Sequence, residues 1–97
     1  MEIRFTWNEE KARLNLLNHG VSFESAKEVF QDPNQVVSEN YFKDGEQRLQ
    51  IIGMTRNAAL LLVVFVDHSN PDIEIIHIIS ARKGEAIEEQ AYEEQIG

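Results

Sequence analysis

Apolar residues near the N-terminus recur every three to four positions, which is the period of an α-helix. The first such segment follows Asn8, a residue type that commonly caps a helix, and stops at a glycine. The second follows Ser22, another capping residue type, and stops before a proline. The pattern therefore predicts two short helices in tandem, Lys11 to His19 and Phe23 to Phe30.

Beyond residue 33 the helical period gives way to extended segments that are separated by turn residues such as Asp44-Gly45. Four strands are predicted: Gln35 to Glu39, Gln47 to Met54, Ala59 to Val66 and Ile73 to Ser80. The third is an unbroken apolar run, which is typical of a central strand covered on both faces. The connections are short, whereas a parallel crossover needs a dozen or more residues, so these strands should be antiparallel neighbours.

Two further elements complete the predicted fold. Residues Ile3 to Thr6 could add a short edge strand, and residues 84–95 read as a terminal helix. The order predicts an α+β fold in which two N-terminal helices pack on one face of a four- to five-stranded antiparallel sheet, followed by a C-terminal helix. A chain of 97 residues has room for one core, so residues 1–97 are expected to form a single domain.

The composition narrows the classes of protein that the chain could belong to. It contains no cysteine, which excludes disulfides, thiolate metal sites and a cysteine nucleophile. The longest apolar run, residues 58–66, is too short to span a bilayer and the N-terminus lacks the apolar segment of a signal peptide. A cytoplasmic protein with no membrane association is the expectation.

Nine basic and 17 acidic side chains give a formal charge of −8, which would ordinarily argue against a nucleic-acid partner. Residues 85–97, however, hold five of the acids and no base, so the other 84 residues carry a net charge of −3. A local basic patch is therefore compatible with the total, and its candidate members are Arg48, Arg56, Arg82 and Lys83. The alternative is that these are ordinary solvated charges.

The three histidines are the only side chains that titrate near neutral pH without help from their surroundings. His19 lies at the end of a predicted helix, which indicates a capping residue. His68 precedes a predicted turn, which indicates a solvated side chain. In an alternating strand His77 shares a face with Ile73, Ile75 and Ile79, which is more typical of a hydrogen-bonded residue at the edge of a core. By pKa it is nevertheless the best candidate for a general acid or base.

Known motifs for metal, phosphate and hydrolase sites are missing from the sequence. The histidines lie far apart, the five glycines are isolated, and no serine sits in a nucleophile elbow. We therefore expect no metal and no cofactor.

Two charged pairs remain as candidate chemistry. Glu46-x-Arg48 places a carboxylate and a guanidinium on one face of a strand, either as a weak ion pair or as a base beside a phosphate clamp. Arg82 and Lys83 lie at the entrance of the last helix, where cations oppose the helix dipole. Either an anionic partner or a carboxylate from Glu85 or Glu88 would explain them.

Three blocks of residues, in order and spacing, resemble the BrnT family of bacterial type II toxin–antitoxin systems, whose ribonuclease toxins have a fold similar to RelE and ParE. The blocks are Phe5-x-Trp7-Asn8-x-x-Lys11 with Asn15, His19-Gly20-Val21-x-Phe23-Glu24-x-Ala26 and Val29-Phe30-x-Asp32-Pro33; Glu46-x-Arg48 with Ile52-Gly53 and Leu61 to Val64; and Ile78-Ile79-Ser80-Ala81-Arg82-Lys83 with Glu88 and Tyr92-Glu93.

The resemblance implies a metal-independent endoribonuclease that cuts cellular RNA and is neutralised by a BrnA-type antitoxin, with which it could form a heterotetramer. In such enzymes the RNA 2′-hydroxyl attacks the adjacent phosphate, which calls for a base, an acid and cations around the phosphorane. Matched positions suggest Arg48 and Arg82 for the phosphate, Lys83 for charge or acid chemistry, and Glu46 as base with His77 as the alternative. The substrate-binding set comprises Arg48, Arg56, Arg82, Glu88 and Tyr92.

Two features depart from the usual pattern of the family. His77 stands where relatives usually have arginine, and the last helix is acidic where relatives are usually rich in lysine and arginine. Fewer phosphate contacts weaken RNA binding strongly at physiological salt, so we expect weak RNA affinity. The alternative function is a non-catalytic module that keeps the toxin fold and only binds the antitoxin.

Overall fold

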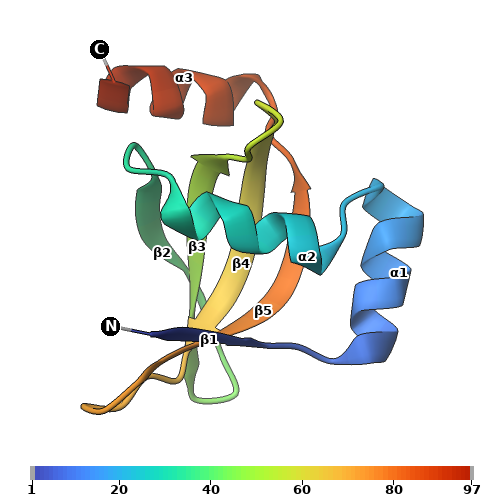
Figure 1. Ribbon diagram of the computed structural model, residues 1–97, viewed down its shortest axis with the longest axis vertical. Coiled ribbons are helices and arrows are strands. Elements are labelled where there is room, and N and C mark those ends of the chain that lie inside the picture. Colours follow the sequence, from blue (N-terminus) through green and yellow to red (C-terminus); the bar gives the residue numbers. More distant parts are fainter. Residues whose placement is uncertain (1, 97) are drawn as a thin grey trace.

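A single five-stranded sheet organises the chain, with the strand order β1-β5-β4-β3-β2 (Figure 1). The computed structural model describes residues 2–96, so Met1 and Gly97, the two ends of the predicted domain, lie outside it. The strands are β1 (Ile3–Thr6), β2 (Val36–Lys43), β3 (Glu46–Met54), β4 (Leu60–Asp67) and β5 (Glu74–Lys83). The helices are α1 (Glu9–His19), α2 (Phe23–Ala26), the 3-10 helix η1 (Lys27–Gln31) and α3 (Ala86–Ile96).

The first predicted helix begins and ends where its capping residues indicate. The Asn8 side chain accepts a hydrogen bond from the Lys11 N–H at 3.0 Å, and Gly20 takes the left-handed conformation that closes α1. The second differs in detail, because only Phe23–Ala26 is α-helical and the segment tightens into η1 up to Gln31. The predicted helix from Phe23 to Phe30 is therefore one α-helical turn followed by a 3-10 helix.

The expectation of a purely antiparallel sheet is wrong at one edge. Strand β1 pairs with β5 in parallel, with Thr6 opposite His77, whereas the other three pairings are antiparallel. The rule of short connections does not apply to this pair, since the helices and three strands separate β1 from β5 along the chain. The sheet is therefore mixed and the fold is α+β.

The helices α2 and η1 cover one face of the sheet and bury the main core beneath them (Figure 1). Phe23 and Val29 pack there on the sheet residues Ile51, Val63 and Ile78, which are all essentially inaccessible to solvent. Strand β4 lies in the middle of the sheet and is buried on both faces over much of its length, as its apolar run predicts.

The opposite face of the sheet is only partly covered. The helix α3 crosses one end of it (Figure 1), where Tyr92 packs against Ile52 and Leu62. No helix in the described part of the chain covers the rest of this face of the sheet. We call this uncovered part the open face. Its polar residues include Asn40, Glu46, Arg48, Gln50, His77, Ser80 and Arg82, as the pairing register and the hydrogen bond from Asn40 to Gln50 place them.

Strand β5 runs three residues beyond its predicted end, and a bulge resets its alternation. Val64 pairs with Ser80 but Phe65 pairs with Ile78, so Ile79 is an extra residue in the ladder. As a result Ala81 joins Ile78 in the main core. Arg82 therefore turns toward the open face as part of the strand and not as part of a helix entrance.

Candidate functional site

Three side chains that can carry or exchange protons meet at the end of the open face that lies away from α3. Glu46 opens β3, His68 follows β4, and His77 lies in β5. The Glu46 Oε2 and His68 Nε2 atoms are 3.0 Å apart, and the rings of His68 and His77 stack with centroids 5.7 Å apart. We call Glu46, His68 and His77 the histidine cluster. The tight β2–β3 turn, where Asp44 and Gly45 both have positive φ, brings Glu46 to this position.

The surroundings of His77 favour its neutral form. Burial lowers the pKa of His77 below its ordinary value of 6.5, and the electrostatic influence of His68, Lys11 and Arg48 acts in the same direction, against the carboxylate of Glu46. Its Nδ1 atom lies 2.8 Å from the Thr6 hydroxyl oxygen on β1, which orients the ring. His77 is therefore available as a proton acceptor near neutral pH.

Arg48 lies beside the histidine cluster and forms no ion pair within residues 2–96. Among the described residues no carboxylate lies within 4.0 Å of its guanidinium, whose Cζ atom is 5.9 Å from the centre of the Tyr41 ring. Its Nε atom is buried without a hydrogen-bond partner. Arg48 as a whole is only partly buried, and a cation with no carboxylate beside it among residues 2–96 is suited to an anionic ligand.

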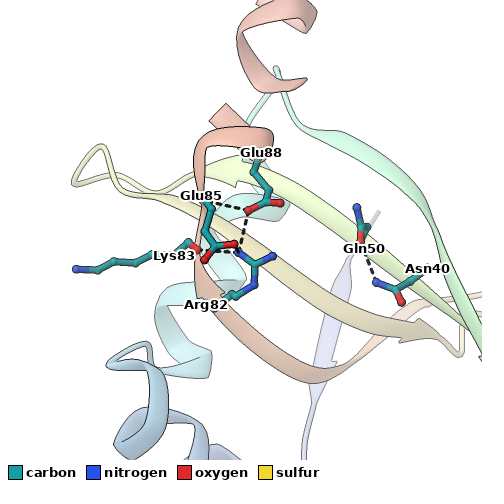
Figure 2. Close-up of polar contacts among 6 residues, drawn as sticks. All are labelled: Asn40, Gln50, Arg82, Lys83, Glu85 and Glu88. Carbon is teal, nitrogen blue, oxygen red and sulfur yellow. Dashed lines mark hydrogen bonds and ion pairs between the residues drawn. The ribbon is translucent and has the colours of Figure 1, made fainter. Parts of the chain in front are cut away.

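Arg82, at the opposite end of the open face, is neutralised within the protein. Its Nη1 atom donates to Glu88 Oε1 at 2.8 Å and lies 3.8 Å from Glu85 Oε1 (Figure 2). The hydrogen bond to Glu88 raises the pKa of Arg82, and the same bond lowers the pKa of Glu88. Of the two explanations for cations at this place, the structure shows the carboxylate partner.

Glu88 and Tyr92 hold α3 in place. Glu88 is buried and also accepts a hydrogen bond from the Glu85 N–H at 2.7 Å, which caps the start of the helix. The Tyr92 hydroxyl donates to Asp32 Oδ2 at 2.6 Å. Burial and this bond raise the pKa of Tyr92. Burial alone would raise the pKa of Asp32, but the hydrogen bonds that it accepts, from Tyr92 first, outweigh burial and lower it.

Lys83 and Arg56 do not lie on the open face. Lys83 pairs with Leu61, whose side chain belongs to the main core, so it projects to the helix side of the sheet, and Figure 2 shows it extending away from Arg82. The backbone N–H of Arg56 donates to Glu28 Oε1 at 3.0 Å, beside η1. Of the predicted site residues, the structure therefore brings together Glu46, Arg48 and His77, and separates Arg82 from Lys83 and Arg56.

Sequence reasoning missed several residues of this region, among them His68 and Thr6. His68 follows the apolar run of β4 and precedes a turn, so it reads as solvated. Its backbone N–H in fact extends the ladder by donating to Ile75 at 2.9 Å, which carries the ring toward His77. Only the pairing of strands reveals this proximity, because eight residues separate the two histidines in the chain.

Residues 2–96 contain neither a candidate metal-binding cluster nor a candidate membrane-spanning helix. No group of three or more histidine, aspartate or glutamate side chains in this range is arranged to hold a metal ion. None of the helices in this range combines the length and the apolar character needed to cross a bilayer.

The comparisons with known proteins agree with the fold. A family model described as "Ribonuclease toxin, BrnT, of type II toxin-antitoxin system" matches residues 7–88. Among solved structures, the 1.1 Å crystal structure of the Brucella abortus ribonuclease toxin BrnT is similar with a TM-score of 0.61 and 21% sequence identity. The match covers 87% of this chain and 99% of that one. A comparison with curated proteins finds no match.

Proposed function

Because this chain belongs to the BrnT family of ribonuclease toxins of type II toxin–antitoxin systems, we propose that it is a metal-independent endoribonuclease that cleaves cellular RNA. The chemistry is the one that the resemblance to RelE-like toxins implies. The 2′-hydroxyl oxygen attacks the adjacent phosphorus and the bond from phosphorus to the 5′-oxygen breaks. The products are one fragment with a 2′,3′-cyclic phosphate and one with a 5′-hydroxyl.

The histidine cluster supplies the proton transfers of this reaction. His77, held neutral by its surroundings, accepts the proton of the 2′-hydroxyl. His68, bonded to Glu46, delivers a proton to the departing 5′-oxygen. Glu46 is then the partner of the acid, and it remains the alternative base.

The proposal rests on the charge of Arg48, unpaired within the described part of the chain, and on its position beside the histidine cluster. Among residues 2–96, Arg48 has no carboxylate partner and its buried Nε atom has no hydrogen-bond partner, and it lies beside a neutral histidine and a carboxylate–histidine pair. A phosphate on the partly exposed Arg48 would neutralise the guanidinium charge and would itself gain charge as the phosphorane forms, which is where preorganised cations accelerate such reactions most. In this scheme Arg82, which donates a hydrogen bond to Glu88, stabilises the position of α3.

Induced expression in a bacterial host tests this proposal. The wild-type chain should arrest growth, and Arg48→Ala should relieve the arrest at an equal level of soluble protein. Arg13→Ala is the matched control, because Arg13 is an exposed α1 residue paired with Glu10, and it should arrest growth like the wild type. Equal arrest by Arg48→Ala and the wild type would count against the proposed site.

The proposal extends to the partner and the place of action. The family is defined by toxin–antitoxin pairs, so we propose a cognate BrnA-type antitoxin that binds this chain in the cytoplasm, assembled as a heterotetramer. Co-purification of the two chains, with the mass of the complex measured by light scattering, tests the assembly. A complex containing one copy of each chain would contradict the heterotetramer.

One observation favours a second candidate function, a non-catalytic module that only binds the antitoxin. The helix α3 is acidic and has no basic residue, and Arg82 is already neutralised by Glu88, so one end of the open face repels phosphate. This candidate predicts a chain that binds its antitoxin but leaves RNA intact in a metal chelator. RNA fragmentation that Arg48→Ala abolishes would exclude it.

A further inference from the structure

Strand β2 contains an irregularity directly beside Arg48. Glu39 pairs with Leu49 and Phe42 pairs with Gln47, so two residues of β2, Asn40 and Tyr41, stand opposite Arg48 alone. Such a bulge adds a residue to one strand and re-aims the side chains around it, and bulges are frequent next to active sites. Here it brings the side chains of both bulge residues close to residues of the open face.

The two bulge residues make different contacts. The centre of the Tyr41 ring lies 5.9 Å from the Arg48 Cζ atom, and the residue remains 47% exposed, so part of Tyr41 is accessible to a ligand. The Asn40 Nδ2 atom donates to Gln50 Oε1 at 2.8 Å, and Figure 2 shows this amide pair apart from the Arg82–Glu88 group. Gln50 is two positions from Arg48 on β3, on the same face and about 7 Å along the strand.

These groups match what an unpaired RNA base offers. A base in single-stranded RNA stacks on an aromatic ring and presents donors and acceptors along its edge. Within the amide pair, the mutual bond uses one Asn40 hydrogen and the Gln50 oxygen. It leaves the Asn40 oxygen as an acceptor and the Gln50 NH₂ group as a donor, which is a complementary pair for a base edge.

We propose that Asn40, Tyr41 and Gln50 form a nucleobase-recognition subsite that selects the base next to the phosphate held by Arg48. The inference rests on the proposed function, because it assumes that RNA lies on the open face. Tyr41 supplies the stacking surface and the amide pair reads the edge of the base. The subsite therefore determines which nucleotide is cleaved and leaves the proton transfers to the histidine cluster.

The test measures base preference on two matched sets of oligonucleotides. Each set has four members that differ only in the base beside the cleaved bond. One set is RNA, for kcat/KM, and the other carries a 2′-deoxy sugar at that position, which removes the nucleophile and allows Kd to be measured without cleavage. The variants are Asn40→Ala, Gln50→Ala, Tyr41→Ala and Tyr41→Phe.

The two control substitutions are made at residues of the same two strands whose side chains face away from the open face. Gln47→Ala removes an amide from β3, where the Gln47 side chain donates to the Arg48 carbonyl oxygen. Phe42→Ala removes an exposed ring from β2 directly opposite Gln47, on the far face of the sheet. Both should keep the wild-type base preference, while circular dichroism checks that every variant is folded.

The subsite predicts that Asn40→Ala and Gln50→Ala reduce the ratio between the best and the worst base about tenfold to hundredfold, the size of one good base-edge contact. Tyr41→Ala should raise KM and Kd about tenfold, and Tyr41→Phe should restore both, because the ring alone stacks.

The outcomes separate this inference from the proposed function. Cleavage by the wild type with the same base ratio in all variants would overturn the subsite and leave the ribonuclease in place. Base-selective binding of the 2′-deoxy set that Gln50→Ala abolishes, with RNA left intact, would support the subsite and contradict cleavage. A wild type that binds no oligonucleotide, as expected if the face serves only a protein partner, would overturn both.

Discussion

The hydrogen bond from Tyr92 to Asp32 fastens α3 to the sheet, and Tyr92→Phe tests its strength. Tyr92 is 6% exposed, and its hydroxyl donates to Asp32 Oδ2 at 2.6 Å, an atom that also accepts the Met54 N–H at 2.7 Å. The substitution removes one donor from an ionised, largely buried carboxylate but keeps the ring packed on Ile52 and Leu62.

A hydrogen bond to a charged group contributes about 1.5–3 kcal/mol net, so Tyr92→Phe should lower the free energy of unfolding by about that amount. For a domain of this size each kcal/mol corresponds to a fall in Tm of roughly 4–8 °C. The loss should stay below the roughly 3–5 kcal/mol expected when a whole buried aromatic side chain is removed.

Urea unfolding followed by circular dichroism measures the change, with Tyr41→Phe as the matched control. Tyr41 is 47% exposed, so removing its hydroxyl should change the free energy of unfolding by less than about 0.5 kcal/mol. The difference between Tyr92→Phe and the wild type should be full above pH 3.8, the ordinary pKa of Asp32, and shrink as the pH falls through its lowered folded value. Wild-type stability of Tyr92→Phe together with weaker RNA binding would refute this reasoning and return Tyr92 to the substrate site.

Three further predictions follow from buried polar contacts. Arg82→Ala leaves the buried Glu88 without its guanidinium and should cost about 1.5–3 kcal/mol in urea unfolding, whereas Lys83→Ala should cost less than about 0.5 kcal/mol; equal costs would contradict the ion pair. Asn15→Ala removes three hydrogen bonds to backbone groups and should cost about 1.5–4 kcal/mol by the same measurement, and a neutral result would contradict their role. Because the pKa of His77 is lowered in the fold, the unfolded chain binds its proton more readily, so Tm should fall as the pH drops below 6.5, and His77→Gln should flatten that slope; an unchanged slope would count against the shift.

Local rules predicted much of the secondary structure. Asn8, Ser22 and Gly20 mark helix ends because a cap needs only the residue and its immediate neighbours. The apolar run of β4 identifies the central strand, because a strand buried on both faces has no polar side. In each case the signal and the structure occupy the same short segment.

The errors arise where distant segments meet. The parallel pairing of β1 with β5 depends on the path of the whole chain between them. The bulge at Ile79 depends on the register with β4, and it decides that Arg82 turns to the open face. Alternation along β5 alone would place Arg82 on the face that the bulge gives to Ala81.

In the candidate site, too, local features could be predicted from the sequence and contacts between distant segments could not. Glu46-x-Arg48 is readable as a pair on one strand face, because alternation is local. The approach of His68 to His77, and the bulge that brings Asn40 and Tyr41 to Arg48, require the pairing of strands. Charge counting identified α3 as acidic, but only the structure shows that Glu88 of this helix neutralises Arg82.

The most direct test of the account is a cleavage assay with purified protein and end-labelled single-stranded RNA in excess chelator, with the fragment ends analysed by mass spectrometry. The account predicts fragments that end in a 2′,3′-cyclic phosphate and a loss of about a hundredfold or more in kcat/KM for Arg48→Ala, with Arg13→Ala unaffected. Intact RNA, or cleavage to the same extent by Arg48→Ala, would contradict the claim that this face of the sheet is a ribonuclease site.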